Sequence, residues 1–443
     1  MKMRYTLLLA AAALTLSSCL DRVPVDSVPA DGVITDLKSA QVALTGAYDA
    51  AQEFEGHEIV TLNYASDNVI LFSAQAIVVP QFKAAGTAGW DPTAGGGFDS
   101  YYVGINQANT VIKYLPAVAG DETKKADLLA QAYFLRALAY FDLARTYGGV
   151  QLVLDPSESP DNGSGIKKSS YKDVLGQVKT DLEKAEGLFG DGLSTKAKAS
   201  LWAVYALKAR VCLYLEQWSE AAQYASKVIG SGKFSLMPEI KDVYSTAMNA
   251  ESIFELVFSS ADRLPFFTYY LPSDKGGRLD YIPSQELVGE LLDPTLGGKR
   301  AQFIRDKGDG VYVVEEYAKQ DGSSSIPVLR LAEQYLIRAE ARLKGGSPDL
   351  DGARADINVI RSRAGLPDTE LADAASLLRL LESERRYELA FEAHRFNDIV
   401  RTGRAAEVFG AFDPIFKDSR YWVLPFPNNA ILADSDLEQN DGY

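Results

Sequence analysis

Three glutamates recur at four-residue intervals in the C-terminal part of this sequence, at Glu384, Glu388 and Glu392. A helix would place them on one face, and paired carboxylates are the groups that glycoside hydrolysis uses. A glycosidase pair, however, flanks its substrate from separate sides of a cleft. Basic residues also lie nearby in the same segment, at Arg385, Arg386 and Arg395. We therefore expect structural ion pairs here, and we expect Arg136, Asp142 and Arg145 to fasten helices together in the same way.

Other motifs with chemical potential are sparse. The chain has only two histidines, His57 and His394, so a histidine-rich metal site is excluded. The glycines at 95–97 are not followed by Lys-Ser or Lys-Thr, as a phosphate-binding loop requires. Cys212 falls within a helical apolar pattern, which favours a buried and unreactive thiol. The sequence therefore carries no enzyme signature, and we expect no catalytic residue, cofactor or metal.

The N-terminal segment has the plan of an export signal. Lys2 and Arg4 precede an apolar run over residues 7–16, which is too short to span a bilayer. Small residues then lead directly to Cys19, an arrangement that looks like a bacterial lipobox. We expect a signal peptide over residues 1–18, lipidation of Cys19 and a flexible tether over residues 19–34. The alternative is an ordinary secretory signal with a chance cysteine.

Composition restricts the partners of the remaining chain. The 443 residues are 47% hydrophobic, which is enough for a substantial core. The formal net charge is −15, which argues against nucleic acid because phosphate binding relies on basic patches. No later stretch reaches membrane-spanning length without charged residues.

Helical periodicity dominates the elements that must position any site. Helices are predicted over residues 126–147, 171–189, 196–216, 219–230, 329–344 and 351–363. Alanines recur within the last two pairs of these segments, which would let antiparallel helices approach closely, as in tetratricopeptide units. Residues 231–327 are instead rich in Gly, Pro, Ser and aromatic residues, with strand candidates at 252–258 and 310–314. We predict a mainly α fold over residues 35–443, with a helical scaffold at 35–230 and 328–410 and a loop-rich lobe at 231–327.

Four long motifs carry a family resemblance. They are AQAYFLRALAYFDLARTYGGV at 130–150, the segment 328–367, LESERRYELAFEAHRFNDIVRTGR at 381–404, and the pair LPFP at 424–427 and QNDGY at 439–443. In this order they strongly resemble the SusD/RagB family of outer-membrane lipoproteins from Bacteroidetes. The resemblance implies four tetratricopeptide-like helix pairs and an inserted lobe that carries the ligand site. It also implies a SusC-like TonB-dependent transporter as partner, a location at the outer membrane facing the cell exterior, and a glycan as the usual ligand.

The resemblance places the ligand site on the lobe and on the loop before the first conserved helix. Sugar binding uses aromatic rings, which pack on the C–H face of a pyranose, and planar polar groups, which meet its hydroxyls. The candidates in the first loop are Trp90, Asp91, Phe98 and Tyr101, of which Trp90 is favoured. The candidates in the lobe are Phe266, Phe267, Tyr269, Tyr270 and Tyr281, with Arg263, Asp274 and Arg278 as polar partners.

The sequence departs from the family pattern at two points, and three other functions are alternatives to glycan binding and delivery. The chain is shorter than many family members, which predicts a reduced lobe, and Leu20-Asp21-Arg22 is not the acidic run linked to surface export. A lipid-anchored module that only assembles proteins is one alternative to a glycan-binding protein. A peptide-binding member of the family is the second alternative, and a glycan-cleaving enzyme is the third.

Overall fold

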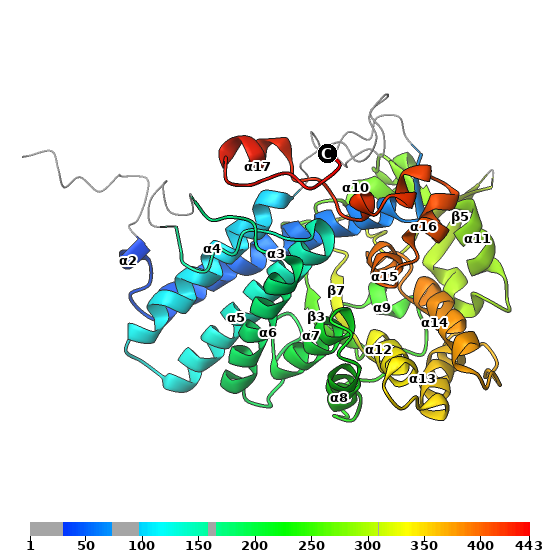
Figure 1. The fold of residues 1–443 in the computed structure, drawn as a ribbon, viewed down its shortest axis with the longest axis horizontal. Helices are drawn as coiled ribbons and strands as arrows, with labels where there is room; N and C mark the ends of the chain where they lie inside the picture. Colours follow the sequence, from blue (N-terminus) through cyan, green and yellow to red (C-terminus); the bar gives the residue numbers. More distant parts are fainter. Residues whose placement is uncertain (1–29, 73–96, 158–164, 309) are drawn as a thin grey trace, which may run out of the picture.

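The computed structural model describes residues 30–72, 97–157, 165–308 and 310–443. Most of these residues are helical (Figure 1), and the strands among them form short two-stranded sheets. The predicted mainly α fold is confirmed. No helix in the described ranges is both long and apolar enough to cross a bilayer.

The N-terminal part of the scaffold is a run of helices with one short strand. These elements are α2 Ala30–Val33, α3 Leu37–Ala65, β1 Val69–Leu71, α4 Phe98–Tyr114, α5 Glu122–Tyr147, α6 Tyr171–Leu188, α7 Leu201–Tyr214 and α8 Trp218–Ile229.

The lobe and the C-terminal part follow. The lobe contains α9 Asp242–Ser245, β3 Ser252–Leu256, α10 Phe267–Tyr270, β4 Tyr281–Pro283, α11 Gln285–Leu292, β5 Ile304–Gly308, β6 Val311–Val314 and β7 Ile326–Arg330. The C-terminal helices are α12 Leu331–Lys344, α13 Leu350–Arg363, α14 Ala374–Glu388, α15 Arg395–Arg401, α16 Ala405–Val408 and α17 Asn428–Ala433.

Side-chain caps explain where several helices begin. Asp36 accepts a hydrogen bond from Ser39 N at the start of α3, and the backbone N–H of Asp36 donates in turn to Ser39 Oγ. Ser170 and Ser200 cap α6 and α7 through single hydrogen bonds to backbone N–H groups. At the other end of α5, Gly148 adopts a φ of 78°, which glycine accepts without strain and which stops the helix.

The helices pack as consecutive antiparallel pairs. The pairs are α3/α4, α5/α6, α7/α8 and α12/α13, and α12 also packs extensively on α8. This contact lets the last pair continue the stack although the lobe separates it from the others in sequence (Figure 1). The arrangement agrees with the tetratricopeptide-like pairs that the family resemblance implies.

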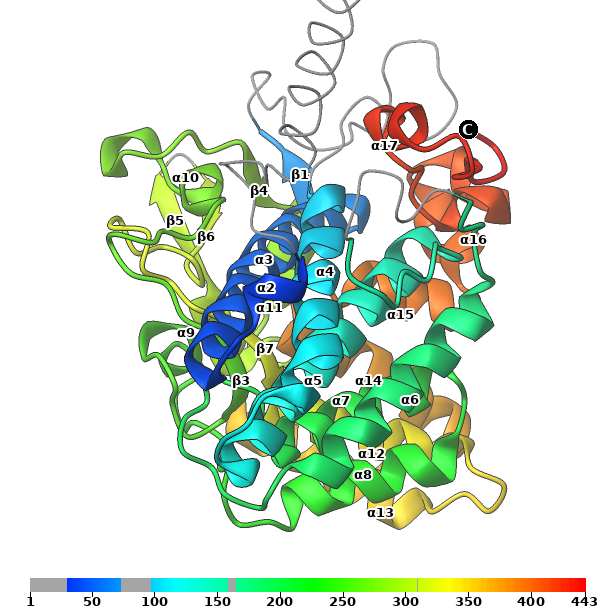
Figure 2. The same cartoon turned by 90° about the vertical axis from the view of Figure 1, so that its left-hand side faces the viewer.

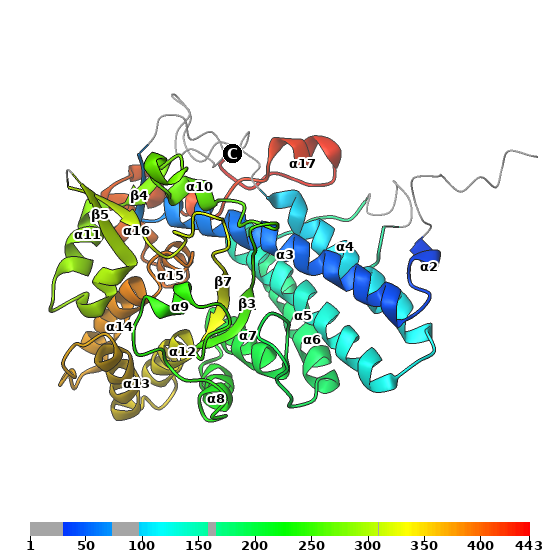
Figure 3. The same cartoon turned by 180° about the vertical axis from the view of Figure 1, so that it is seen from behind.

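The strands connect the lobe to the scaffold. β3 pairs antiparallel with β7, β1 with β4, and β5 with β6. Viewed from behind, β3 and β7 lie at the centre of the molecule, between the α3–α7 helices and the part of the lobe that holds β5 and α11 (Figure 3). The β3–β7 sheet therefore lies at the centre of the fold and joins the lobe to the helical scaffold.

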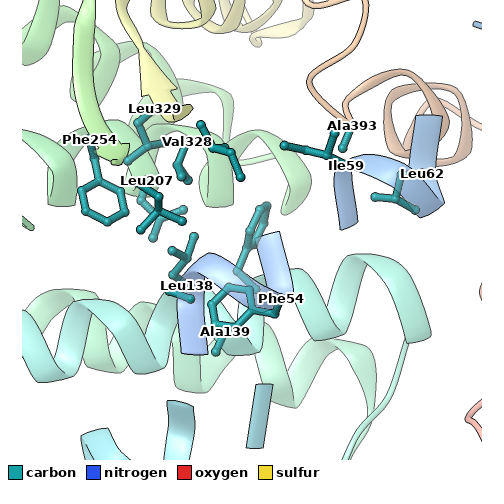
Figure 4. Close-up of a cluster of buried hydrophobic side chains, with 14 of the residues drawn as sticks. Phe54, Ile59, Leu62, Leu138, Ala139, Leu207, Phe254, Val328, Leu329 and Ala393 are labelled. Atoms are coloured by element: carbon teal, nitrogen blue, oxygen red, sulfur yellow. The ribbon is translucent and has the colours of Figure 1, made fainter. Parts of the chain in front are cut away.

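One continuous core joins these parts. Figure 4 shows Phe54 of α3, Leu138 of α5, Leu207 of α7, Phe254 of β3 and Leu329 of β7 converging in the interior. Each of these side chains is buried. Burial of large apolar side chains stabilises a fold by about 1.5–3 kcal/mol each, so scaffold and lobe stabilise one another.

The carboxyl end of α3 is closed by a distant segment. Asn63 Nδ2 donates to Phe391 O at 2.6 Å, and Asn68 Nδ2 donates to Ala390 O at 2.7 Å. Asp67 accepts two hydrogen bonds from Arg395, at 2.8 and 2.9 Å. The end of the first long helix is therefore held by residues more than 300 positions later in the chain.

Candidate functional site

Three of the predicted site residues lie outside the described residues. They are Cys19, Trp90 and Asp91. Their predicted roles in lipidation and ligand binding therefore remain predictions.

Two aromatic candidates near the first loop are buried on the core face of α4. Phe98 contacts Tyr147 and Phe426, with ring centroids 5.1 and 5.6 Å away, and Tyr101 stacks on Phe54 at 4.5 Å. The face of Tyr101 is thus covered by protein, so it does not offer a stacking surface to a ligand. A signal for this existed in the sequence, because Phe98, Tyr101 and Ile105 follow the helical period of a core-facing stripe.

Three aromatic candidates of the lobe are buried as well. Phe266, Tyr270 and Tyr281 form one cluster around Tyr317, with Phe266 and Tyr317 centroids 5.1 Å apart. Each of the three is at most 2% exposed. The prediction placed them at the ligand surface, whereas the structure uses them to pack the lobe on α3, because large aromatic rings gain most by leaving water.

Tyr269 and Arg278 are the lobe candidates that the structure brings together at the surface. The Arg278 guanidinium carbon lies 5.0 Å from the centroid of the Tyr269 ring, and Arg278 Nη2 lies 2.7 Å from Asp280 Oδ2. Arg278 is exposed, Tyr269 is half-buried and Asp280 is buried. Burial raises the pKa of Asp280, and the adjacent guanidinium opposes that rise.

The backbone fixes this arrangement. Arg278 N donates to Thr268 O, and Asp280 N donates to Tyr269 O, both at 2.7 Å. These two bonds hold the segment after α10 against α10 itself. The aromatic ring, the guanidinium and the carboxylate are therefore pre-positioned, as a binding site for a polar ring compound would need.

The remaining lobe candidates flank this group. The Arg263 guanidinium carbon lies 5.7 Å from the ring centroid of Phe267, which is half-buried at the start of α10. Asp274 is exposed in the short 3₁₀ turn Ser273–Lys275. Both aromatic residues of α10 that are not fully buried thus carry an arginine over the ring.

A groove beside α4 and α17 was not predicted. It has a volume of about 730 Å³, and Phe98 contributes to its wall. Amide and carboxylate side chains line it, including Asn106, Gln107, Gln151 and Asp434. Figure 2 shows α17 and α10 at the same end of the molecule. Asn106 and Gln107 are consecutive residues of a helix and form no recognisable motif, so the sequence does not predict this polar lining.

The glutamates at 384, 388 and 392 are ion-paired, as predicted, but with other partners. Glu384 contacts Arg300 and Arg361 at 2.6 Å each. Glu388 contacts Arg300 at 3.1 Å and Arg330 at 2.8 Å, and it also pairs with Arg363.

Arg330 joins this group to further carboxylates. Its guanidinium lies 2.7 Å from Glu251 and 2.6 Å from Glu392. We call the whole group the buried ion network, which comprises Glu251, Arg300, Arg330, Arg361, Arg363, Glu384, Glu388 and Glu392. Its four arginines balance its four glutamates, and each glutamate side chain is at most 6% exposed.

The neighbouring arginines in sequence point elsewhere, which corrects the expected pairing. Arg385 pairs with Asp398, and Arg386 and Arg395 pair with Asp67. Glu392 also lies beyond the end of α14, so the three glutamates do not share one helix. Consecutive helical residues diverge by about 100°, which separates Arg385 and Arg386 from the glutamate face.

The ion pairs predicted for α5 are confirmed. Arg136 Nη2 lies 2.6 Å from Asp181 and so joins α5 to α6. Arg145 contacts Glu58 of α3 at 3.1 Å and Asp142 at 2.8 Å.

Beside Arg145 lies a carboxylate cluster that the sequence did not indicate. Oxygens of Glu55, Glu58 and Asp142 lie within 4.8 Å of one another, and all three residues are buried. Three carboxylates this close could bind one cation together. The Arg145 guanidinium already serves as the cation for Glu58 and Asp142. Burial and the neighbouring carboxylates raise the pKa of Glu55 well above its ordinary range. Burial also raises the pKa of Glu58, to about 7.

This cluster predicts a stability that falls as the pH rises. A carboxyl with a raised pKa binds more protons in the folded than in the unfolded state, so its stabilisation is present below the ordinary pKa of 4.5 and is lost as the pH rises through the folded value. We expect Glu55→Gln, which keeps this site neutral, to be more stable than wild type at about pH 8, by at least ~1 kcal/mol, and to lose this advantage at about pH 5. Urea denaturation at both pH values measures the difference.

The matched control changes an exposed glutamate. Glu183 lies on the exposed side of α6, so Glu183→Gln should follow wild type at both pH values. An equal gain at both pH values for Glu55→Gln would contradict the titration of this cluster.

Cys212 and His394, which the sequence analysis also named, are both buried. Cys212 is buried and reduced, and burial raises the pKa of its thiol to about 12, in agreement with the unreactive role expected for it. His394 is buried directly before α15, where burial and nearby arginines hold its pKa well below the ordinary value.

Stacked helix pairs with a less regular lobe inserted between them define a helical-repeat protein. The model of the SusD family matches residues 303–443, and a model described as starch-binding and associating with the outer membrane matches residues 23–213. Together these matches cover most of the sequence. The chain belongs to the SusD/RagB family.

One relative matches this chain over nearly its full length, and another matches about a third of it. SusD-like protein P38 of Formosa agariphila is 27% identical over 97% of this chain and 96% of its own. The starch-binding protein SusD of Bacteroides thetaiotaomicron is 30% identical over 34% of this chain and 30% of its own.

Solved structures show the same fold. A laminarin-binding SusD-like protein superposes with a TM-score of 0.78 and 25% identity, covering 93% of this chain and all of the other. A SusD superfamily protein from Bacteroides vulgatus superposes with a TM-score of 0.80 at 20% identity, covering 92% of this chain and 99% of its own.

Proposed function

We propose that this protein is a lipid-anchored, outer-membrane glycan-binding protein that passes its ligand to a SusC-like TonB-dependent transporter and catalyses no reaction itself. The observation that carries the binding role is the exposed Arg278 over the half-buried Tyr269 on the lobe, with the buried Asp280 paired to the guanidinium. The laminarin-binding and starch-binding relatives support a glycan as the ligand class.

The chemistry of this group suits a sugar ring. A pyranose places its apolar C–H face on an aromatic ring, while guanidinium and carboxylate groups hydrogen-bond its hydroxyls. Tyr269 supplies the ring, Arg278 supplies the donors at its edge, and the buried Asp280 holds the guanidinium in place. Helix α17 lies at the same end of the molecule as α10 (Figure 2). The groove beside α4 and α17 offers further amides for a longer glycan chain.

The absence of catalysis is proposed on the same physical grounds. The one glutamate series that could resemble a glycosidase pair is neutralised inside the buried ion network, where no cleft separates the carboxylates. A hydrolysis assay on the glycan that binds should therefore release no reducing ends.

Tyr269→Ala is expected to weaken glycan binding by about tenfold or more, because it removes the stacking surface and the support of Arg278. The measurement is a glycan array on protein lacking residues 1–19, followed by calorimetric titration of the best ligand. Trp90→Ala should weaken binding in the same assay if the predicted first-loop site contributes.

The matched control is a tyrosine in the same local arrangement on the helical scaffold. Tyr335 is half-buried, Arg338 lies 5.6 Å from its ring centroid, and Arg338 pairs with Asp356 at 2.6 Å. Tyr335→Ala should leave glycan affinity unchanged. Equal glycan affinity of Tyr269→Ala and wild type would exclude this site. If no glycan binds and the protein still co-purifies with the transporter, the result would favour an assembly module.

A further inference from the structure

A second pocket lies between the C-terminal helices. Its volume is about 380 Å³, and α12, α14, α15 and α16 form its walls (Figure 1). It shares no lining residue with the groove beside α17 or with the Tyr269 group. Seven of its lining side chains are cationic, whereas four are acidic.

Each buried carboxylate of this pocket is shared by two cations. Asp398 accepts from Arg385 at 2.7 Å and from Arg401 at 2.9 Å. Glu340 contacts Arg401 at 2.8 Å and Lys344 at 3.2 Å. Arg386 and Arg395 pair with Asp67, and Arg404 pairs with Glu382 and Glu407. Arg379 is therefore the lining cation that has no carboxylate partner among the described residues.

The two buried carboxylates of the pocket have lowered pKa values. Arg401 and Lys344 hold the pKa of the fully buried Glu340 far below its ordinary range, and Arg385 and Arg401 lower that of Asp398. Burial alone would raise both values, as it does for Glu55. The direct ion pairs thus outweigh the penalty of burial here, so both carboxylates are held in their charged form.

Two arginines of α14 offer donors to this region. Arg385 is 4% exposed and lines the pocket, and its Nη1 has no hydrogen-bond partner within the described part of the chain. A buried guanidinium N–H without an acceptor is costly, so the site favours an acceptor from outside. Arg379, two turns earlier on α14, is exposed at the same pocket and contacts Ser376 Oγ through Nη2.

We propose that this pocket binds an oxyanion, namely a sulfate, phosphate or carboxylate group, either as a free ion or as a substituent of a larger ligand. Arginine forks match the oxygen geometry of such groups and hydrogen-bond them in pairs. Leu378 and Leu381 supply an apolar wall beside the cations, which leaves room for the frame that carries the charged group.

The test titrates inorganic sulfate into the full mature protein at low ionic strength and measures binding by calorimetry and by the shift in melting temperature. Saturable binding with a Kd of about 1 mM or tighter is expected. Arg379→Gln should weaken it about threefold or more, and Arg385→Gln about tenfold or more. Because Arg385 is buried, Arg379→Gln is the variant that tests the site without disturbing the interior.

Arg354→Gln is the control. Arg354 lies on α13 outside the pocket and pairs with Asp351, so its removal changes the net charge equally without touching the site. No saturable sulfate binding, or equal weakening by Arg354→Gln and Arg379→Gln, would overturn the proposal.

Two further arms separate the sources of the anion. A sulfated oligosaccharide that binds at least about tenfold tighter than both inorganic sulfate and its desulfated counterpart assigns the pocket to a substituent of a larger ligand. Affinity equal to that of inorganic sulfate assigns it to the free ion. Tyr269→Ala should leave inorganic sulfate binding unchanged, so failure of the glycan site and failure of this pocket are distinguishable.

Discussion

Arg330→Met is expected to destabilise the protein by about 3–5 kcal/mol, the usual effect of removing one partner from a buried ion group. Arg330 is 2% exposed and contacts Glu251, Glu388 and Glu392 at 2.6–2.8 Å. Methionine fills much of the volume of the arginine side chain, so little cavity is created. The lost stability therefore measures the cost of leaving the buried carboxylates without their guanidinium. The shift of the urea denaturation midpoint, with the slope held, measures it.

An exposed arginine of the lobe provides the comparison. Arg305 contacts Glu315 at 2.6 Å on the β5–β6 hairpin, with 37% and 32% of the two side chains exposed. Arg305→Met should change stability by less than about 1 kcal/mol, because solvent already screens the pair. Equal effects of the two substitutions would mean that the network contributes no more than a surface pair.

Cys19→Ser is expected to move the protein from the membrane fraction to the soluble fraction. Stable anchoring by acyl chains requires at least two of them, and the proposed attachment point for both is this one residue. Fractionation of cells followed by immunoblotting measures the change. The affinity of the released protein for its glycan should equal that of the anchored form.

The chain supplies its own control in its second cysteine. Cys212 is buried, so Cys212→Ser should leave the protein in the membrane fraction. Membrane association that survives Cys19→Ser would contradict the lipobox interpretation. Wild-type protein in the soluble fraction would favour an ordinary signal peptide.

Regular segments of the fold could be predicted closely. The helix predicted over residues 351–363 is Leu350–Arg363, and the strand predicted at 252–258 is Ser252–Leu256. The helix predicted to begin at 196 begins instead at Leu201, because Ser200 caps it and the preceding residues pair with the lobe backbone. Helix α11 within the lobe was missed, since its eight residues are too short for a clear period.

The site was predictable only in part. Residue types pointed to the lobe aromatics, and the half-buried Tyr269 lies there beneath the exposed Arg278. Phe266, Tyr270 and Tyr281 have neighbours in sequence of the same types as those of Tyr269, yet their side chains face inward. In an irregular segment no period distinguishes inward from outward side chains, so tertiary packing alone decides this.

The same limit applies to charge pairing. Spacing within one helix identified glutamates that need partners, but Arg300 and Arg330 reach them from the lobe. Contacts between residues 58 to 88 positions apart leave no local pattern in the sequence.

The closure of α3 by residues 390–395 has a consequence for the order in which the molecule assembles. Asn63 and Phe391 are 328 positions apart, and Asn68 and Ala390 are 322 apart. Until that late segment is available, the amides of Asn63 and Asn68 and the carboxylate of Asp67 have no native acceptors or donors, and contacts of such long range form slowly. In an emerging chain the end of α3 therefore acquires these native hydrogen bonds only after nearly all of the sequence has been made.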